Sequence, residues 1–119
     1  MKKAYYLSTC STCKKIIQDL QLADQFFLQD IKTNKITAEQ LEEMAKLAGD
    51  TKLLFSKRSR KYSSLGKQLE EMSESEVKNN ILEEYTFLKR PVIIIDGAIF
   101  IGSSKEVKSS LAAKLKIKN

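Results

Sequence analysis

The chain has 119 residues and a formal net charge of +6, and 42% of its residues are apolar while 30% are charged. This length and composition predict one soluble globular domain, and no stretch approaches the ~18 apolar residues of a membrane helix. The sequence has no histidine and two cysteines. It therefore excludes Ser-His-Asp and Cys-His catalysis, and it excludes a four-cysteine zinc site within one chain.

The first part of the chain predicts a strand, a helix, a strand and a second helix. Residues 4–7 are a short β-prone run, and residues 11–22 have apolar residues at helical spacing. Residues 25–31 predict the second strand. A capping box that begins at Thr37 opens the next helix, which we expect to end near Gly49.

The rest of the chain predicts a helical block, a hairpin and a last helix. Residues 51–88 indicate short helices and turns, with another capping box at Ser73. Residues 91–95 are apolar on both faces, which predicts a central, buried strand. An Asp-Gly turn then leads to a return strand over residues 98–101. The last helix carries three apolar residues on one face, Val107, Leu111 and Leu115.

This order of elements predicts an α/β protein with a thioredoxin-like fold. The β-α-β start needs a crossover helix, so its two strands should be parallel. The β-β-α end is an antiparallel hairpin followed by a helix. A mixed four-stranded sheet accommodates both halves, in a single domain over residues 1–119 with an inserted helical block at about residues 37–88.

A Cys-x-x-Cys pair, Cys10 and Cys13, lies where the first strand ends and the first helix begins. The free amides and the dipole of a helix N-terminus favour a thiolate, and Lys14 and Lys15 add positive charge. Cys10, at the cap, is better placed than Cys13. A Cys10 thiolate can attack a substrate, and Cys13 can then release the product by closing a disulfide. We therefore interpret both cysteines as catalytic.

Two other interpretations of this cysteine pair stay open. The pair could supply half of a zinc site that a second chain completes, or it could be two inert residues at a helix start. No metal site within the chain is predicted. Two cysteines in a protein of this kind are more often redox-active than a structural bridge, and we expect the protein to be cytoplasmic.

The single proline, Pro91, supports the redox interpretation. In thioredoxin-like folds a cis-proline before the third strand packs against the cysteine motif, and Pro91 directly precedes a buried predicted strand. A trans-proline at a strand start is the alternative, because a missing amide does little harm there.

The charges of the chain are unevenly distributed. A basic cluster comprises Lys57, Arg58, Arg60 and Lys61, and an acidic stretch follows over residues 70–84. Separate patches fit a small anion or an acidic protein surface better than a continuous nucleic-acid track, so we do not expect nucleic-acid binding. Solvated faces are the alternative interpretation.

Four segments resemble the ArsC/Spx family of thioredoxin-fold proteins. These are the YYLSTCSTCKK run over residues 5–15, residues 53–66 with their Ser-x-Arg-Ser sequence, the KRPVIII run over residues 89–95, and the Ile-Gly pair before the last helix. The resemblance covers essentially the whole chain and keeps the order of the motifs. It implies an arsenate reductase-like thiol oxidoreductase.

The resemblance also implies a set of site residues. Cys10 matches the nucleophile, and the implied oxyanion- or substrate-binding residues are Ser11, Thr12, Arg58, Arg90 and Pro91. A guanidinium fork suits a tetrahedral oxyanion; a surface ion pair is the alternative for Arg90. We expect no bound cofactor, because no glycine-rich dinucleotide loop follows either early strand. Glutathione, a thioredoxin or a glutaredoxin is the expected reductant.

At three positions the arsenate reductases or the Spx proteins of the family have a characteristic residue, and the residues of this chain at those positions bear on its function. Arsenate reductases carry a further arginine where this chain has Ser103, and Arg58 is placed as in Spx proteins. Spx proteins use the cysteine pair as a redox switch and bind the RNA polymerase α subunit through an interface with a glycine, where this chain has Asp50. We therefore expect an enzyme that acts on a small oxyanion or a glutathione-linked substrate with a redox partner protein. An Spx-like regulator that binds the RNA polymerase α subunit is the alternative.

Overall fold

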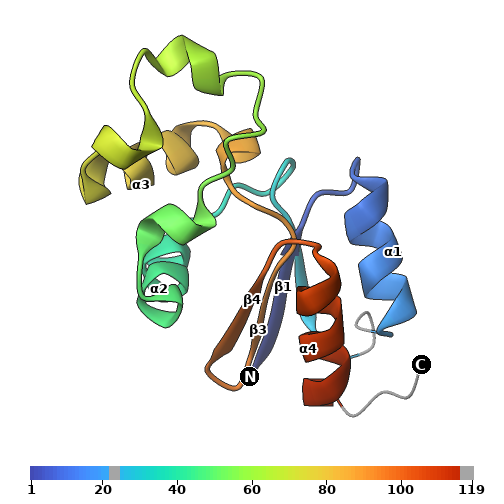
Figure 1. Ribbon diagram of the computed structural model, residues 1–119. Helices are drawn as coiled ribbons and strands as arrows, with labels where there is room; N and C mark the ends of the chain where they lie inside the picture. Colours follow the sequence, from blue (N-terminus) through green and yellow to red (C-terminus); the bar gives the residue numbers. More distant parts are fainter. Residues whose placement is uncertain (22–24, 116–119) are drawn as a thin grey trace. The chain divides into compact units, whose positions relative to one another are not determined.

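A four-stranded mixed sheet joins the two ends of the chain in the computed structural model, which describes residues 1–21 and 25–115 (Figure 1). β1 (Lys2–Tyr6) pairs in parallel with β2 (Phe27–Asp30) and antiparallel with β3 (Val92–Ile95). β3 also pairs antiparallel with β4 (Ala98–Ile101), so the strand order within the described residues is β2-β1-β3-β4. The predicted mixed sheet is confirmed.

The prediction of a central, buried strand is also confirmed. β3 lies between β1 and β4, and its four residues are at most 3% exposed. Branched apolar side chains suit this position because they pack well on both faces of a pleated strand. Ala4 of β1 lies opposite Ile93 of β3 and is also fully buried. The two interior strands therefore form the rigid centre of the sheet.

Two helices, α1 (Ser11–Asp19) and α4 (Lys105–Leu115), cover one face of this sheet (Figure 1). Their apolar residues pack with strand residues in one buried cluster, which comprises Ala4, Ile16, Ile17, Leu20, Phe26, Ile93, Ile95, Leu111 and Ala112. Each fully buried leucine or isoleucine contributes about 1.5–3 kcal/mol. This packing fixes the direction of α1 and the place where it begins.

The element boundaries differ from the prediction at several ends. The first strand covers Lys2–Tyr6 instead of residues 4–7, because pairing with β3 extends it to two lysines that have no strand preference of their own. The first helix was predicted to reach Leu22, which lies outside the described residues; α1 ends at Asp19. β2 is shorter than residues 25–31, although the Ile31 amide still donates to the Tyr6 carbonyl (2.9 Å).

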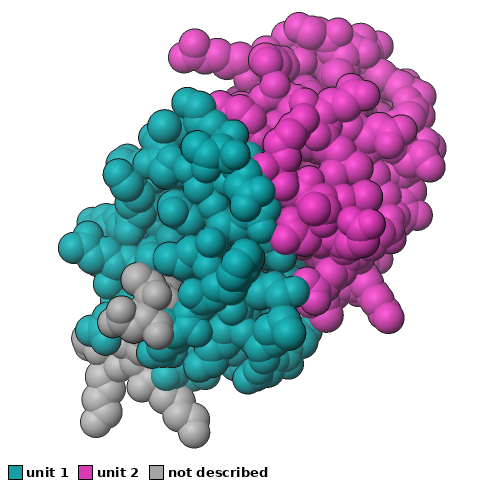
Figure 2. All heavy atoms as spheres, turned by 180° about the vertical axis from the view of Figure 1, so that it is seen from behind, with its two compact units in different colours: residues 1–34, 90–119 teal, residues 35–89 magenta. Residues whose placement is uncertain are grey.

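The chain divides into two units, coloured separately in Figure 2. The sheet unit comprises residues 1–34 and 90–119, and the helical unit comprises residues 35–89. The prediction of a single domain stays a prediction. In the described part of both units, no helix is long and apolar enough to cross a membrane.

The helical unit consists of two α-helices and four short 3-10 helices within its described residues. The α-helices are α2 (Ala38–Ala48) and α3 (Glu74–Glu83). The 3-10 helices are η1 (Thr51–Leu54), η2 (Tyr62–Leu65), η3 (Leu69–Glu71) and η4 (Tyr85–Phe87). Both predicted capping boxes form, at Thr37 and at Ser73, and Gly49 ends α2 in the left-handed conformation. These caps satisfy helix-end amides and carbonyls without help from the rest of the fold.

Aromatic packing closes the helical unit. Phe55 stacks on Phe87 with ring centroids 5.0 Å apart and meets the edge of Tyr62 at 5.7 Å. The amide of Lys89 donates to the carbonyl of Leu54 (2.8 Å), which ties the last residue of the unit to its middle. The Phe55–Phe87 and Leu54–Lys89 contacts connect residues more than thirty positions apart, so no local sequence pattern could reveal them.

Glu84 makes the helical unit sensitive to acid. Its carboxylate accepts hydrogen bonds from the Lys61 ammonium (2.7 Å) and from the amide (3.1 Å) and hydroxyl (2.7 Å) of Thr86. The Lys61 hydrogen bond and those of Thr86 lower the pKa of Glu84 to about 2. Because this pKa is lower in the folded chain than in the unfolded chain, the stabilisation is complete above about pH 5 and is lost as the pH falls toward about 2.

We expect Glu84→Gln to lower the free energy of unfolding by about 1–2 kcal/mol at neutral pH, since the charge-assisted bonds are lost. Urea unfolding at neutral pH and at about pH 3 would show this difference shrinking in acid. The exposed neighbour Glu83 supplies the matched control, Glu83→Gln. A deficit in Glu84→Gln that stayed the same at both pH values would contradict the prediction.

Candidate active site

The cysteine pair lies at the junction between β1 and α1. The chain leaves β1 at Tyr6 and turns within four residues, and the amide of Cys10 donates to the carbonyl of Leu7 (2.9 Å). Cys10 has extended backbone angles and is the N-cap of α1, and its carbonyl accepts from the amide of Lys14 (3.2 Å). Both cysteines are free. The predicted location of the pair is therefore observed.

The turn before Cys10 is fastened to the end of β2 by Asp30. The carboxylate of Asp30 accepts from the amide of Ser8 (3.3 Å), from the Ser8 hydroxyl, and from the amide of Lys32 (3.1 Å). The Ser8 hydroxyl hydrogen bond is the main cause that lowers the pKa of Asp30. Asp30 therefore stays charged at neutral pH and holds this turn continuously.

The first turn of α1 favours a thiolate on Cys10. Burial of the side chain works to raise the pKa of Cys10, but other groups outweigh it. These groups are the amide and the thiol of Cys13, the amide of Thr12 and the charge of Arg90, which together leave the pKa below its ordinary value. Cys10 is half-buried, so part of its side chain is accessible to a partner. Helix-start amides stabilise an anionic sulfur in this way.

Cys13 has the opposite environment. Its side chain is fully buried, and this burial, with the neighbouring Cys10 sulfur, raises the pKa of Cys13 to about 12 against the lowering effects of the Leu7 amide and Arg90. Cys13 therefore carries its proton at neutral pH and can donate it toward Cys10. The arrangement suits Cys10 for nucleophilic attack and Cys13 for the later closure of a disulfide.

Arg90 and Pro91 lie directly before β3. The peptide bond between them is cis, and Pro91 is buried while Arg90 is half-buried. The charge of Arg90 works to lower the pKa of both sulfurs, although it is the weakest of the effects on each, so its guanidinium lies within electrostatic range of the pair. The carbonyl of Pro91 accepts from the amide of Gly102 (2.9 Å), which holds this corner against the loop after β4.

The other predicted site residues are placed as follows. Ser11 and Thr12 are exposed on the first turn of α1, beside Cys10. Ser103 is half-buried in the loop after β4. Arg58 belongs to the helical unit, where it is exposed on a loop whose neighbouring Ser59 hydroxyl bonds to that of Thr86 (2.8 Å). The role of Arg58 in binding stays a prediction.

Two residues of this site were missed in the sequence analysis, Ser8 and Asp30. Ser8 lies in the run over residues 5–15 but was given no role there, and Asp30 belongs to no motif. The available signal was positional: parallel neighbouring strands end at the same edge of a sheet, so polar residues that follow β1 and end β2 should meet there. That inference needs the strand order, which the sequence indicated only as a fold class.

The charges along α1 run against its helix dipole. Lys14 and Lys15 are exposed in its first turns, no acidic residue lies there, and Asp19 ends the helix. α2 shows the usual order, with Glu39 first and Lys46 last. Because the dipole already places partial positive charge at the N-terminus, the lysines add to the positive potential around Cys10. This end of α1 attracts anions.

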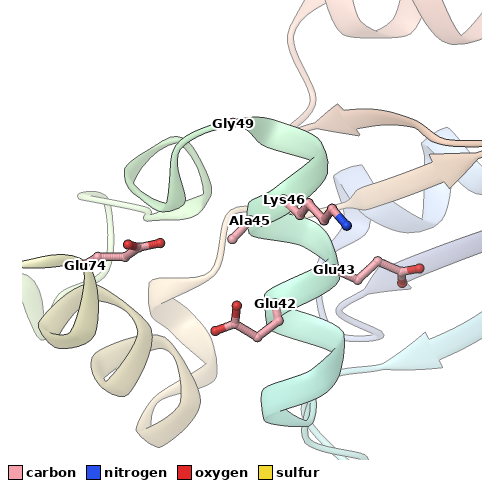
Figure 3. Close-up of a pocket in the computed structure, with 6 residues that line it drawn as sticks. All are labelled: Glu42, Glu43, Ala45, Lys46, Gly49 and Glu74. Carbon is pink, nitrogen blue, oxygen red and sulfur yellow. The ribbon is translucent and has the colours of Figure 1, made fainter.

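A hollow of about 450 Å³ in the helical unit, unlike the start of α1, is lined mainly by acidic side chains. Figure 3 shows the carboxylates of Glu42 and Glu74 directed into the space between α2 and α3. Lys78 bridges these two carboxylates at 2.6 and 3.2 Å. The hollow contains no thiol and its acidic lining disfavours an oxyanion. In the part of the chain that the structure describes, no group of three or more side chains could hold a metal ion.

Comparisons with known proteins agree with this geometry. The model of the ArsC family matches residues 5–110. Global transcriptional regulator Spx 2 of Bacillus cereus is 25% identical over 107 residues, which cover 86% of this chain and 79% of that protein. An ArsC family related protein of Bacteroides fragilis is 23% identical with a TM-score of 0.76, covering 92% of this chain and 97% of that one. An arsenate reductase of Vibrio cholerae is 15% identical with a TM-score of 0.74, covering 98% and 97%. The structural likeness confirms the thioredoxin-like fold.

The two thiols should differ strongly in reactivity. We expect alkylation of Cys10 by iodoacetamide to titrate below the ordinary thiol range, while Cys13 stays almost unreactive at neutral pH. Arg90→Gln should shift the Cys10 titration to higher pH, because a positive charge beside the thiolate is lost. Alkylation rates across pH, with the sites identified by mass spectrometry, test this directly. Equal reactivity of Cys13 in Cys10→Ser and of Cys10 in Cys13→Ser would contradict it.

Proposed function

The chain belongs to the ArsC family, and we propose that it is a thiol-dependent oxidoreductase whose Cys10 attacks a small anionic substrate. The substrate is an oxyanion such as arsenate or a glutathione mixed disulfide, and the reaction takes place in a reducing compartment such as the cytoplasm. One observation carries this proposal: two free thiols with opposite pKa shifts lie at a helix start, within electrostatic range of Arg90.

With a glutathione mixed disulfide, the reaction proceeds in two exchanges. The Cys10 thiolate attacks the glutathione sulfur, a Cys10–glutathione disulfide forms, and the substrate leaves as a thiolate that takes up a proton. The Cys13 sulfur then attacks Cys10 and releases glutathione, which receives the proton that Cys13 gives up. The enzyme ends with a Cys10–Cys13 disulfide, and two electrons have passed to the substrate.

With arsenate, Cys10 displaces water from the arsenic atom and forms a sulfur–arsenic bond. Attack of a second thiol on the Cys10 sulfur breaks that bond and leaves its electron pair on arsenic, so arsenite departs and a disulfide remains. The second thiol is Cys13 or glutathione. A thioredoxin, a glutaredoxin or glutathione then reduces the disulfide and returns both cysteines to thiols.

The positive groups around Cys10 support an anionic substrate. The guanidinium of Arg90 matches the geometry of an oxyanion or a carboxylate. Ser11 and Thr12 present the free amides of the helix start. Lys14 and Lys15 extend the positive potential to the surface. Ser103 stands where an arsenate reductase has a further arginine, which favours a glutathione-linked substrate over arsenate.

The second candidate is an Spx-like redox-switched regulator. The observation that favours it is the match to Global transcriptional regulator Spx 2 over most of both chains. In that case the Cys10–Cys13 disulfide changes the affinity for a protein partner, the RNA polymerase α subunit, and the helical unit forms the contact surface. A pull-down of that subunit with the oxidised and the reduced protein tests this function.

Turnover should require Cys10. We expect NADPH-coupled reduction of a glutathione mixed disulfide, and more slowly of arsenate, to be abolished in Cys10→Ser, because the attacking sulfur is lost. Cys13→Ser should keep turnover with glutathione and glutaredoxin but lose it with thioredoxin, since no internal disulfide can form.

The two cysteine variants control for each other, since both remove one sulfur from the same turn. Unchanged turnover in Cys10→Ser would contradict the proposed function. Absence of turnover with arsenate, mixed disulfide and every reductant, together with redox-dependent capture of the polymerase subunit, would favour the regulator.

The protein should discriminate disulfides by charge. We expect Cys10 to react faster with oxidised glutathione, an anion, than with cystamine, a cation, and the ratio should fall as salt screens the lysines. Lys14→Glu with Lys15→Glu should lower this ratio by about tenfold at low salt. Stopped-flow rates with the two disulfides provide the measurement.

The matched control is Lys105→Glu with Lys108→Glu, which changes the net charge equally on exposed residues of α4. A ratio that falls as much in the control shows that the net charge of the protein, rather than the charges of α1, selects the substrate.

A further inference from the structure

The turn that delivers Cys10 to the helix start is held from two sides. On one side Leu7 is 6% exposed and sits in the core. On the other side Ser8 donates from its amide and its hydroxyl to the carboxylate of Asp30, which β2 holds rigidly beside β1. Thr9, between Ser8 and Cys10, is exposed. The position of Cys10 therefore depends on where Ser8 is held.

The turn over residues 7–10 affects the surroundings of both cysteine sulfurs. Its backbone closes through the hydrogen bond from the Cys10 amide to the Leu7 carbonyl. The Leu7 amide also acts on the sulfur of Cys13, where its hydrogen bond works to lower the pKa of that thiol against the burial that raises it. A shift of this turn would move Cys10 away from the α1 amides and change the contact to Cys13 as well.

We propose that the Ser8–Asp30 pair is a positioning device, which holds the turn so that the Cys10 sulfur stays at the start of α1, near the amides of Thr12 and Cys13. The proposal rests on the proposed function in one respect, because it takes Cys10 as the nucleophile. Hydrogen bonds to a thiolate weaken steeply with distance and angle. Release of the turn therefore costs thiolate stability even when the helix itself remains intact.

Three roles of Asp30 predict three different results. A positioning role predicts that loss of the carboxylate raises the pKa of Cys10, since the helix amides no longer meet the sulfur. A role as a nearby negative charge predicts a lower pKa of Cys10 after the same change, since repulsion of the thiolate disappears. A role in fold support alone predicts a lower melting temperature with an unchanged titration of Cys10.

The test uses the full reduced chain and three variants, Ser8→Ala, Asp30→Ala and Asp30→Asn. The readout is the rate of Cys10 alkylation by iodoacetamide across pH, with the melting temperature measured in parallel. We expect the first two variants to react about three- to tenfold more slowly at neutral pH, with the limiting rate at high pH unchanged. Asp30→Asn should be intermediate, because its amide oxygen still accepts from the Ser8 amide.

The double variant, Ser8→Ala with Asp30→Ala, should be no slower than the slower single variant, because both changes break one interaction. The matched control is Asp19→Ala, which removes an equal charge from the exposed end of α1 and should leave the Cys10 titration unchanged. If Asp30→Ala does not fold, Ser8→Ala carries the test, since it removes one hydroxyl and keeps the charge.

Faster alkylation of Asp30→Ala at neutral pH, or an unchanged titration in both single variants, overturns the proposal. Because alkylation needs neither substrate nor reductant, its outcome is independent of the turnover assay. Absence of turnover in the wild type would remove the proposed function and leave the positioning result standing. Normal turnover with an unchanged titration in Ser8→Ala would remove the positioning role alone.

Discussion

The packing of α1 against the sheet is the constraint on which the site depends. Ile16 and Ile17 are buried against Ala4 and Ile93, so the helix cannot rotate or slide without exposing apolar surface. With the helix fixed, its first amides point at one place, and the turn after β1 brings Cys10 there. The reactivity of the thiol is therefore a consequence of core packing several residues away.

Burial gives the two cysteine side chains different chemical properties. Cys10 is accessible and meets the amides, whereas Cys13 lies one helical turn inside and is fully buried. The charge of Arg90 acts on both sulfurs, yet the pKa of Cys10 falls and that of Cys13 rises to about 12, because hydrogen bonds outweigh the effect of burial only at Cys10. This difference suits the proposed roles, in which Cys10 attacks and Cys13 keeps its proton until the disulfide closes.

The two units differ in how their charged residues are placed. Lys14 and Lys15 lie in the first turns of α1, against the preference of the helix dipole, and the charge of Arg90 acts on Cys10. In the helical unit, Lys78 bridges Glu42 and Glu74, and Lys61 pairs with Glu84. Charges in the helical unit are thus held in pairs, whereas the positive charges at the start of α1 suit an anionic ligand.

The sequence by itself determined the fold class, the order of elements, both capping boxes and the cysteine pair at a helix start, because each follows from local patterns or from their order along the chain. The buried strand at residues 91–95 was equally readable, since its apolar run has no polar face. Only the tertiary structure decided that Asp30 holds Ser8 and that Arg90 acts on both sulfurs, since these residues meet across 22 and about 80 positions of the chain. It also decided that the first strand begins at Lys2, because pairing with β3, and not strand preference, places lysines in a sheet.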